Sequence, residues 1–171
     1  LWFQRDLRIN DNPALNWALQ QCKPIIAIYI YSPEEDAMWT EGGASRWWLH
    51  QSLKELSKDL LKLNINLNFV KGNSVETIRQ LVKDNQVSSV VWTNRHEPHR
   101  IKYESVIENE LLENSIEVER IIDGLIKHHD NFLTASSNTP YRVFTPFYKK
   151  LRREMNLNDY HVTNKINNRT S

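Results

Sequence analysis

LWFQRDLRINDNPAL, residues 1–15, is the stretch that decides the fold. Its first three residues are apolar, residues 4–12 are polar and rich in charge, and Pro13 suits the first position of a helix. The pattern predicts a strand, a charged turn and a helix, which together make the first βα unit of a parallel sheet. Ligands of such sheets bind outside the carboxyl ends of the strands, so the turn is a candidate binding site.

The composition limits the class of protein. The chain has 171 residues, one cysteine and a formal net charge of +1. Its length is that of about one domain, and a single cysteine excludes an internal disulfide framework. No run approaches the roughly 18 apolar residues of a membrane span, and the net charge gives no general attraction to nucleic acid. We expect a soluble cytoplasmic protein without membrane contact.

Four further strand patterns follow the first one, and helical patterns separate them. Residues 25–31 and 87–92 are apolar without alternation, as in strands covered on both faces, whereas residues 66–70 alternate and predict an edge strand. The fifth strand is expected at residues 116–122. The sequence therefore predicts an α/β fold: a five-stranded, parallel, Rossmann-like sheet of order 3-2-1-4-5, with helices on both faces.

The helix boundaries follow from local signals. Asp11 or Asn12 is expected to cap the helix that begins at Pro13, and Asn73 has Glu76 three residues later, the spacing of a cap. Other helices are expected after Gly43, ending near residue 63; from about residue 99 to 113; and from Pro146, capped by Thr145. Residues 32–41 are expected to be an acidic loop, and residues 156–171 a linker.

This strand order brings two polar turns together. Strand 1 lies beside strand 4 at the switch point, so residues 4–12 and 93–100 are predicted to face each other across one crevice. Their charged groups and nearby tryptophans would suit a flat heteroaromatic ligand, stacked on a ring and hydrogen-bonded at its edge. The alternative is that Arg5 and Asp6 only fix the turn. The candidate residues are Arg5, Asp6, Arg8, Asn94, Arg95, Glu97 and Arg100, with Trp39, Trp47 or Trp48 as an aromatic floor.

The sequence lacks the motifs that usually mark several kinds of catalytic or cofactor site. With four glycines in the chain, neither G-x-G-x-x-G nor a P-loop can be written. The histidines and the single cysteine show no zinc-binding spacing, and there is no G-x-S-x-G nucleophile motif. The crevice therefore remains the place where a ligand is expected.

Four segments together carry a family resemblance: WFQRDLRINDNPAL (2–15), GGASRWWLHQSL (42–53), VVWTNRHEP (90–98) and PYRVFTPF (140–147). In their order and spacing they resemble the amino-terminal domain of the photolyase/cryptochrome family over nearly the whole chain. The chain looks most like the bacterial cyclobutane pyrimidine dimer photolyases.

The resemblance implies one domain of a larger enzyme. Residues 1–135 would form the antenna-binding α/β domain, and residues 136–171 a closing helix and the start of an interdomain linker. A helical domain downstream would hold FAD, bind damaged DNA and act as a deoxyribodipyrimidine photo-lyase, a carbon–carbon lyase. The present chain alone would then be inactive, with no catalytic residue, and the whole protein is expected to be a monomer.

The resemblance leaves the antenna chromophore open. Members that hold methenyltetrahydrofolate in the best-known way carry an Asn-Glu pair after the fourth strand, where this chain has His99 and Arg100. The antenna can therefore be a folate held differently, a deazaflavin or a flavin, or it can be absent. Glu97 is a candidate acceptor for a ring N–H of the chromophore. The alternatives in function are a cryptochrome-type photoreceptor without repair activity and an unrelated nucleotide-binding module, whose expected glycine-rich loop is missing.

Overall fold

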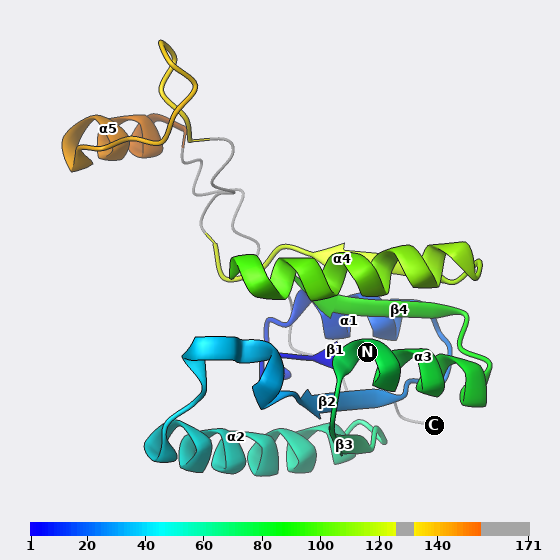
Figure 1. Cartoon of the computed structure of the whole chain (residues 1–171). Helices are drawn as coiled ribbons and strands as arrows, with labels where there is room; N and C mark the ends of the chain where they lie inside the picture. Colours follow the sequence, from blue (N-terminus) through cyan, green and yellow to red (C-terminus); the bar gives the residue numbers. More distant parts are fainter. Residues whose placement is uncertain (126–131, 155–171) are drawn as a thin grey trace. The chain divides into compact units, whose positions relative to one another are not determined.

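Strand β1 (Trp2–Phe3) occupies the centre of a five-stranded sheet (Figure 1). The computed structural model describes residues 1–125 and 132–154. β1 pairs in parallel with β2 (Ala27–Tyr31) on one side and β4 (Ser89–Thr93) on the other. β3 (Leu67–Lys71) and β5 (Glu117–Ile121) form the two edges, also in parallel register. The predicted order 3-2-1-4-5 is confirmed.

Burial along the strands follows their place in the sheet. Trp92 in β4 is 0% exposed, and both residues of β1 are buried. In the edge strand β3, only Leu67 is buried, and Phe69 is 55% exposed. The continuous and alternating apolar patterns therefore distinguished central from edge strands correctly, because a central strand of a parallel sheet is covered on both faces.

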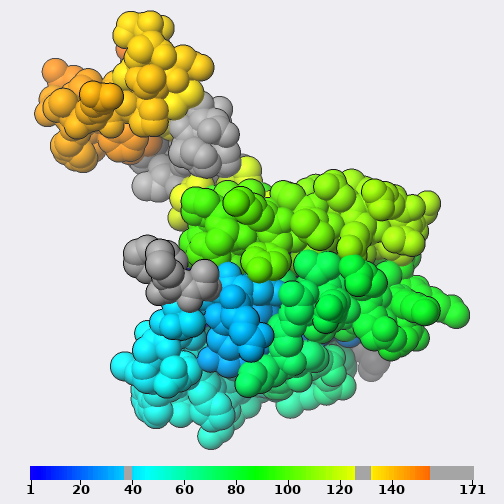
Figure 2. Space-filling view, viewed as in Figure 1, coloured from blue at the N-terminus to red at the C-terminus, as the bar shows by residue number. Residues whose placement is uncertain are grey.

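Helices cover both faces of this sheet. α1 (Pro13–Gln20) and α2 (Gly43–Leu61) pack Leu15 and Leu60 against Phe3. α3 (Ser74–Asn85) and α4 (Pro98–Glu113) pack on the opposite face, where Ile78 and Ile107 join a core with Trp92. Figure 2 shows the side chains of α3 and α4 side by side. The two-faced helical arrangement predicted from the sequence is confirmed.

The two predicted asparagine caps are both formed. Asn12 accepts a hydrogen bond from the N–H of Leu15 at 2.9 Å, and Asn73 accepts one from the N–H of Glu76 at 3.1 Å. These bonds satisfy backbone donors that have no partner within the first turn of a helix. The acidic loop expected at residues 32–41 is instead largely a 3₁₀-helix, η1 (Pro33–Trp39).

The described residues 122–125 and 132–154 belong to a second compact unit, distinct from the unit of residues 1–121. Within it, Leu133 and Pro140 form an isolated antiparallel bridge, and Phe132 packs edge-on against Phe147 of α5 (Phe144–Glu154). The prediction that this last helix begins at Pro146 is wrong by two residues. A proline in the first turn costs no hydrogen bond, because the N–H groups there have no helical acceptor. The expected linker lies outside the described residues, and the domain boundary at residues 135/136 stays a prediction.

Hydropathy of the helices bears on membrane association. Within residues 1–125 and 132–154, no helix is long and apolar enough to cross a bilayer.

Candidate ligand-binding site

A pocket of about 880 Å³ opens at the carboxyl ends of β1, β2 and β4. Its wall contains residues from both predicted turns, including Arg5 and Arg8 after β1 and Arg95 after β4. The crevice predicted between these turns is therefore present. Its remaining wall comes from the end of β2, which sequence reasoning did not assign to it, and from η1 and the first turns of α2, the segments that contain the three tryptophans predicted as an aromatic floor.

The turn after β1 is held in place by a buried carboxylate. Asp6 is 6% exposed, and its Oδ1 accepts the N–H of Gln4 at 3.0 Å. Its Oδ2 accepts the hydroxyl of Thr93 at 2.7 Å and the side-chain amide of Asn12 at 3.2 Å. Asp6 thus ties the turn to the end of β4 and to the cap of α1. This arrangement matches the alternative that Asp6 fixes the turn.

Arg5 lies on the same turn but is much more exposed. Its side chain is 67% exposed, and its Nε is 3.9 Å from Oε1 of Glu97, so the ion pair is loose. Such an exposed pair contributes little to stability. The Arg5 guanidinium is therefore available to an anionic group of a ligand.

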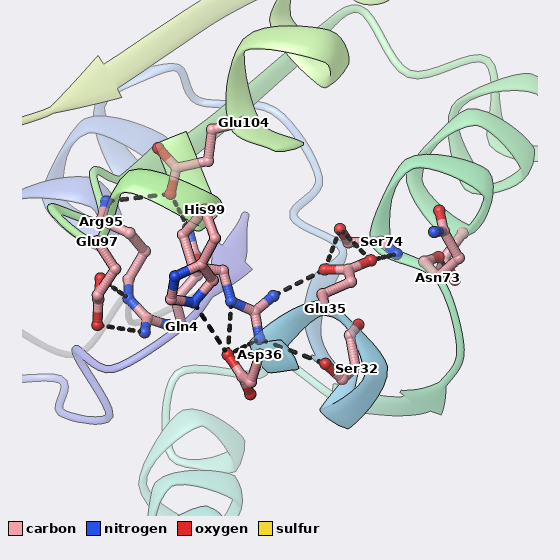
Figure 3. A network of polar contacts seen from close by, with 12 residues as sticks. Gln4, Ser32, Glu35, Asp36, Asn73, Ser74, Arg95, Glu97, His99 and Glu104 are labelled. Carbon is pink, nitrogen blue, oxygen red and sulfur yellow. Dashed lines mark hydrogen bonds and ion pairs between the residues drawn. The ribbon is translucent and has the colours of Figure 1, made fainter. Parts of the chain in front are cut away.

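The turn after β4 is organised around Arg95 and Glu97. Arg95 donates two hydrogen bonds to the Glu97 carboxylate, at 2.9 and 2.6 Å. These bonds are the main reason that the pKa of Glu97 is lowered to about 2. The N–H of Arg95 also donates to the buried carboxylate of Glu104, which accepts the side-chain amide of Gln4 (Figure 3). Both turns are therefore fixed to one buried acceptor on α4.

A second polar network holds the wall formed by η1. Arg100 of α4 is 9% exposed and donates to Glu35 at 2.7 Å and to Asp36 at 2.9 and 2.6 Å. The other oxygen of Glu35 accepts the N–H of Ser74 at the start of α3. His99 places its Nε2 3.7 Å from Asp36. Arg100 touches the pocket, but its guanidinium is already engaged by these two carboxylates.

One tryptophan supplies an aromatic surface to the pocket. Trp48 lines it and is 68% exposed, whereas Trp47, 62% exposed, is not among its described lining residues. The side chain of Trp39 lies outside the described part of the structure. Asp6, Asn94 and Glu97 likewise do not line the pocket within the described residues. The side-chain oxygen of Asn94 instead accepts a hydrogen bond from Arg120 of β5 at 2.9 Å.

Tyr29 and Glu41 are among the pocket residues that sequence reasoning missed. Tyr29 is the middle residue of β2 and lines the pocket. Its pKa is raised to about 12, first by burial and next by the negative charge of Glu41. Glu41 lines the same pocket just before α2. A signal for Tyr29 was available, because β2 also neighbours β1 and its carboxyl end reaches the same edge of the sheet. Glu41 carries no motif that would single it out.

The geometry fits binding of a flat, polar, conjugated molecule. An exposed indole offers a stacking surface, arginines attract anionic groups, and carboxylates accept N–H donors. Within residues 1–125 and 132–154, no cluster of three or more His, Cys, Asp or Glu side chains is arranged to hold a metal. The fold and the pocket thus define a domain of the parallel α/β class with a candidate ligand site.

The chain belongs to the DNA photolyase family, whose sequence model matches residues 1–165. It is 34% identical over 151 residues to a deoxyribodipyrimidine photo-lyase of Agrobacterium fabrum, covering 88% of this chain and 31% of that protein. Cryptochrome-2 of Arabidopsis thaliana is 30% identical over 151 residues, covering 88% of this chain and 24% of that protein. The chain therefore spans less than a third of the length of these relatives.

Solved structures of the family have the same fold. A class III photolyase from Agrobacterium tumefaciens superposes with a TM-score of 0.78 at 33% identity, covering 88% of this chain and 30% of that chain. An archaeal photolyase from Sulfolobus tokodaii, solved with two FAD molecules, gives a TM-score of 0.76 at 26% identity and covers 89% and 34%. The family and fold predicted from the four sequence segments are confirmed.

Proposed function

We propose that the chain is the amino-terminal, antenna-binding domain of a light-dependent DNA repair enzyme, a deoxyribodipyrimidine photolyase. The observation that carries the proposal is the pocket of about 880 Å³ at the switch point, with the exposed Trp48 in its wall. A bound antenna chromophore would absorb near-ultraviolet or blue light and pass the excitation energy to FAD in a helical domain downstream. Membership of the photolyase family supports this assignment.

The residues of this chain would bind and orient the chromophore. Trp48 stacks against its ring, and the charges of Arg5 and Arg95 attract its anionic substituents. Asp6 and Arg100 act indirectly. The hydrogen bonds of Asp6 hold the turn after β1, and those of Arg100 hold the η1 wall. We retain Asn94, Glu97, Trp39 and Trp47 as predicted contacts, although only the first two have described side-chain bonds, to Arg120 and Arg95.

The chemistry of repair belongs to the rest of the proposed enzyme. FAD in the helical domain would supply the electron that splits the cyclobutane ring of a pyrimidine dimer. Damaged DNA and this FAD domain are the proposed partners, and we place the whole protein in the cytoplasm as a monomer. Methenyltetrahydrofolate, a deazaflavin and a flavin are the chromophore classes that this family assignment suggests.

A cryptochrome-type photoreceptor is the second candidate, favoured by the 30% identity to Cryptochrome-2 of Arabidopsis thaliana. Repair of thymine dimers under blue light by the full-length protein, loaded with reduced FAD, separates the two. Dimer loss that depends on light supports the photolyase. No loss despite bound reduced FAD contradicts it and favours the photoreceptor. Oxidised protein kept in the dark is the matched control.

A further inference from the structure

One side of α5 packs against residues of its own compact unit. Phe147 lies edge-on against Phe132 and Tyr141, with 5.7 and 6.2 Å between ring centroids. Lys150 donates to the carbonyl of Leu133 at 3.2 Å, and its Nζ lies 5.4 Å from the centroid of the Phe132 ring. This side of the helix is therefore already engaged.

A column of three planar groups runs along another side of α5. Phe144 and Tyr148, one turn apart, stack with 5.4 Å between ring centroids and 16° between ring planes. The guanidinium of Arg152, one turn further on, lies 5.9 Å from the centroid of the Tyr148 ring. Residues four apart are neighbours on a helix surface, so the column follows the helix axis. Since Tyr148 covers one face of the Phe144 ring and Phe144 is 71% exposed, the other face of that ring is open.

Cationic side chains flank this column. Lys149 and Arg153, also one turn apart, are exposed, and so is Arg142 just before the helix. Residues 132–154 contain five lysines and arginines but a single acidic residue, Glu154, which lies 3.8 Å from Lys150. Among residues 1–125 and 132–154, no carboxylate pairs with the other four cations. The open ring therefore lies within an unbalanced positive charge.

A single strand of nucleic acid carries the two groups that complement this surface. Its unpaired bases have open faces that stack on aromatic rings, and its phosphates attract lysine and arginine. Inside a duplex each base face is covered by the next base pair, which leaves nothing to stack on Phe144. A lipid bilayer fits less well, because an interfacial helix inserts an apolar face. Here the apolar Phe147 is turned toward Phe132, and the exposed column contains Arg152.

We propose that α5 carries a binding surface for single-stranded nucleic acid, with a base stacked on Phe144 and phosphates beside Lys149 and Arg153. This surface belongs to the second compact unit, and none of its residues is among the described residues that line the pocket. It goes beyond the proposed function, in which the chemistry of repair belongs to a domain downstream. It stands whether or not the pocket binds an antenna.

Fluorescence anisotropy of a labelled oligothymidylate of about 16 nucleotides, titrated with the whole chain at several salt concentrations, tests the charge of the surface. Four phosphate contacts predict a slope of up to about −3 for the logarithm of the association constant against that of salt. Lys149→Gln combined with Arg153→Gln should flatten this slope by about 1.4. Lys54→Gln combined with Lys58→Gln is the matched control, because it removes two exposed lysines from α2 and should leave the slope unchanged.

Substitution of Phe144 separates stacking from charge. Phe144→Leu should weaken binding of the single strand by about fivefold or more, since one base–aromatic stack is lost, and should leave the salt slope unchanged. A duplex of the same length should not respond to this substitution, because its base faces are covered. Phe69→Leu is the control, because Phe69 is 55% exposed in β3 and belongs to the other unit.

The salt slope of the unsubstituted chain needs no variant. Absence of salt-dependent binding to the oligonucleotide would overturn the nucleic-acid surface. The same holds if Phe144→Leu leaves single-strand binding unchanged, or if it weakens single strand and duplex equally. Binding to phosphatidylserine vesicles but not to the oligonucleotide would replace it with a membrane surface. Each of these results leaves the antenna proposal standing.

Discussion

Arg100 of α4 and Glu35 of η1, 65 residues apart in the chain, form a buried ion pair with 2.7 Å between Nη1 and Oε2. The Glu35 side chain is 3% exposed and that of Arg100 is 11% exposed. The carboxylate also binds Ser74 at the first residue of α3. One pair of residues therefore joins three elements, and it fixes the η1 wall of the pocket.

Removal of Arg100 should destabilise the fold strongly. Arg100→Met leaves Glu35 buried without its cation, a situation that costs about 3–5 kcal/mol in the free energy of unfolding. Urea denaturation measures this loss. Lys58→Met is the control, since Lys58 pairs with Glu55 on the exposed face of α2 and its loss should change little. If Arg100→Met lowers the unfolding free energy no more than the control does, the buried Arg100–Glu35 ion pair does not stabilise the fold.

The two adjacent tryptophans of α2 should differ in chromophore binding. Trp48 lines the pocket, whereas Trp47 is almost equally exposed and has no described place in its wall. Trp48→Ala should weaken chromophore binding by about 3- to 10-fold, the stacking contribution of an aromatic ring, and Trp47→Ala should not. Fluorescence titration with methenyltetrahydrofolate gives both constants. Equal effects of the two substitutions would argue against stacking on Trp48.

The Arg95–Glu97 pair should make a small, pH-dependent contribution to stability. The hydrogen bonds from Arg95 lower the pKa of Glu97 from 4.5 to about 2 in the folded chain. A lowered pKa means that the contribution is present above about pH 4.5 and is lost as the pH falls toward 2. Glu97 is 35% exposed, so Glu97→Gln should cost less than about 1 kcal/mol at pH 7. Denaturation at several pH values should show this cost shrinking on acidification; a constant cost would rule out the ion pair as its source.

Asp6 and Thr93 should be energetically coupled. The Thr93 hydroxyl donates to Asp6 at 2.7 Å in a buried site that links the first turn to β4. A double-mutant cycle with Asp6→Asn and Thr93→Val should give a coupling of about 1–2 kcal/mol in unfolding free energy. Additive effects of the two substitutions would mean that the hydrogen bond does not hold the turn.

Most of the fold could be predicted because its signals are local. The apolar run ending at Tyr31 and the alternation around Phe69 report how many faces of each strand are covered. Asn12 and Asn73 cap through side chains only three residues from their donors. The start of α5 was misplaced because Thr145 and Pro146 are equally acceptable within a first turn, so the signal does not fix one residue.

The site could be predicted only in outline. Strand order alone brought the two turns to one pocket, but it did not indicate which side chains are free. Arg100 was chosen as a ligand contact, yet Glu35 and Asp36 engage it from a segment 64 and 65 residues away. Glu41 could not be found, because it carries no motif and only the fold brings it into the pocket wall. Pairing between distant polar residues has no short-range pattern in the sequence.

The most direct test of the central claim is the absorption spectrum of the purified chain after incubation with antenna chromophores and removal of free ligand by gel filtration. Methenyltetrahydrofolate, FMN and a deazaflavin are supplied in separate samples. If the domain binds an antenna, a near-ultraviolet or blue band elutes with the protein in at least one sample. A chain that elutes colourless from all three would contradict the account.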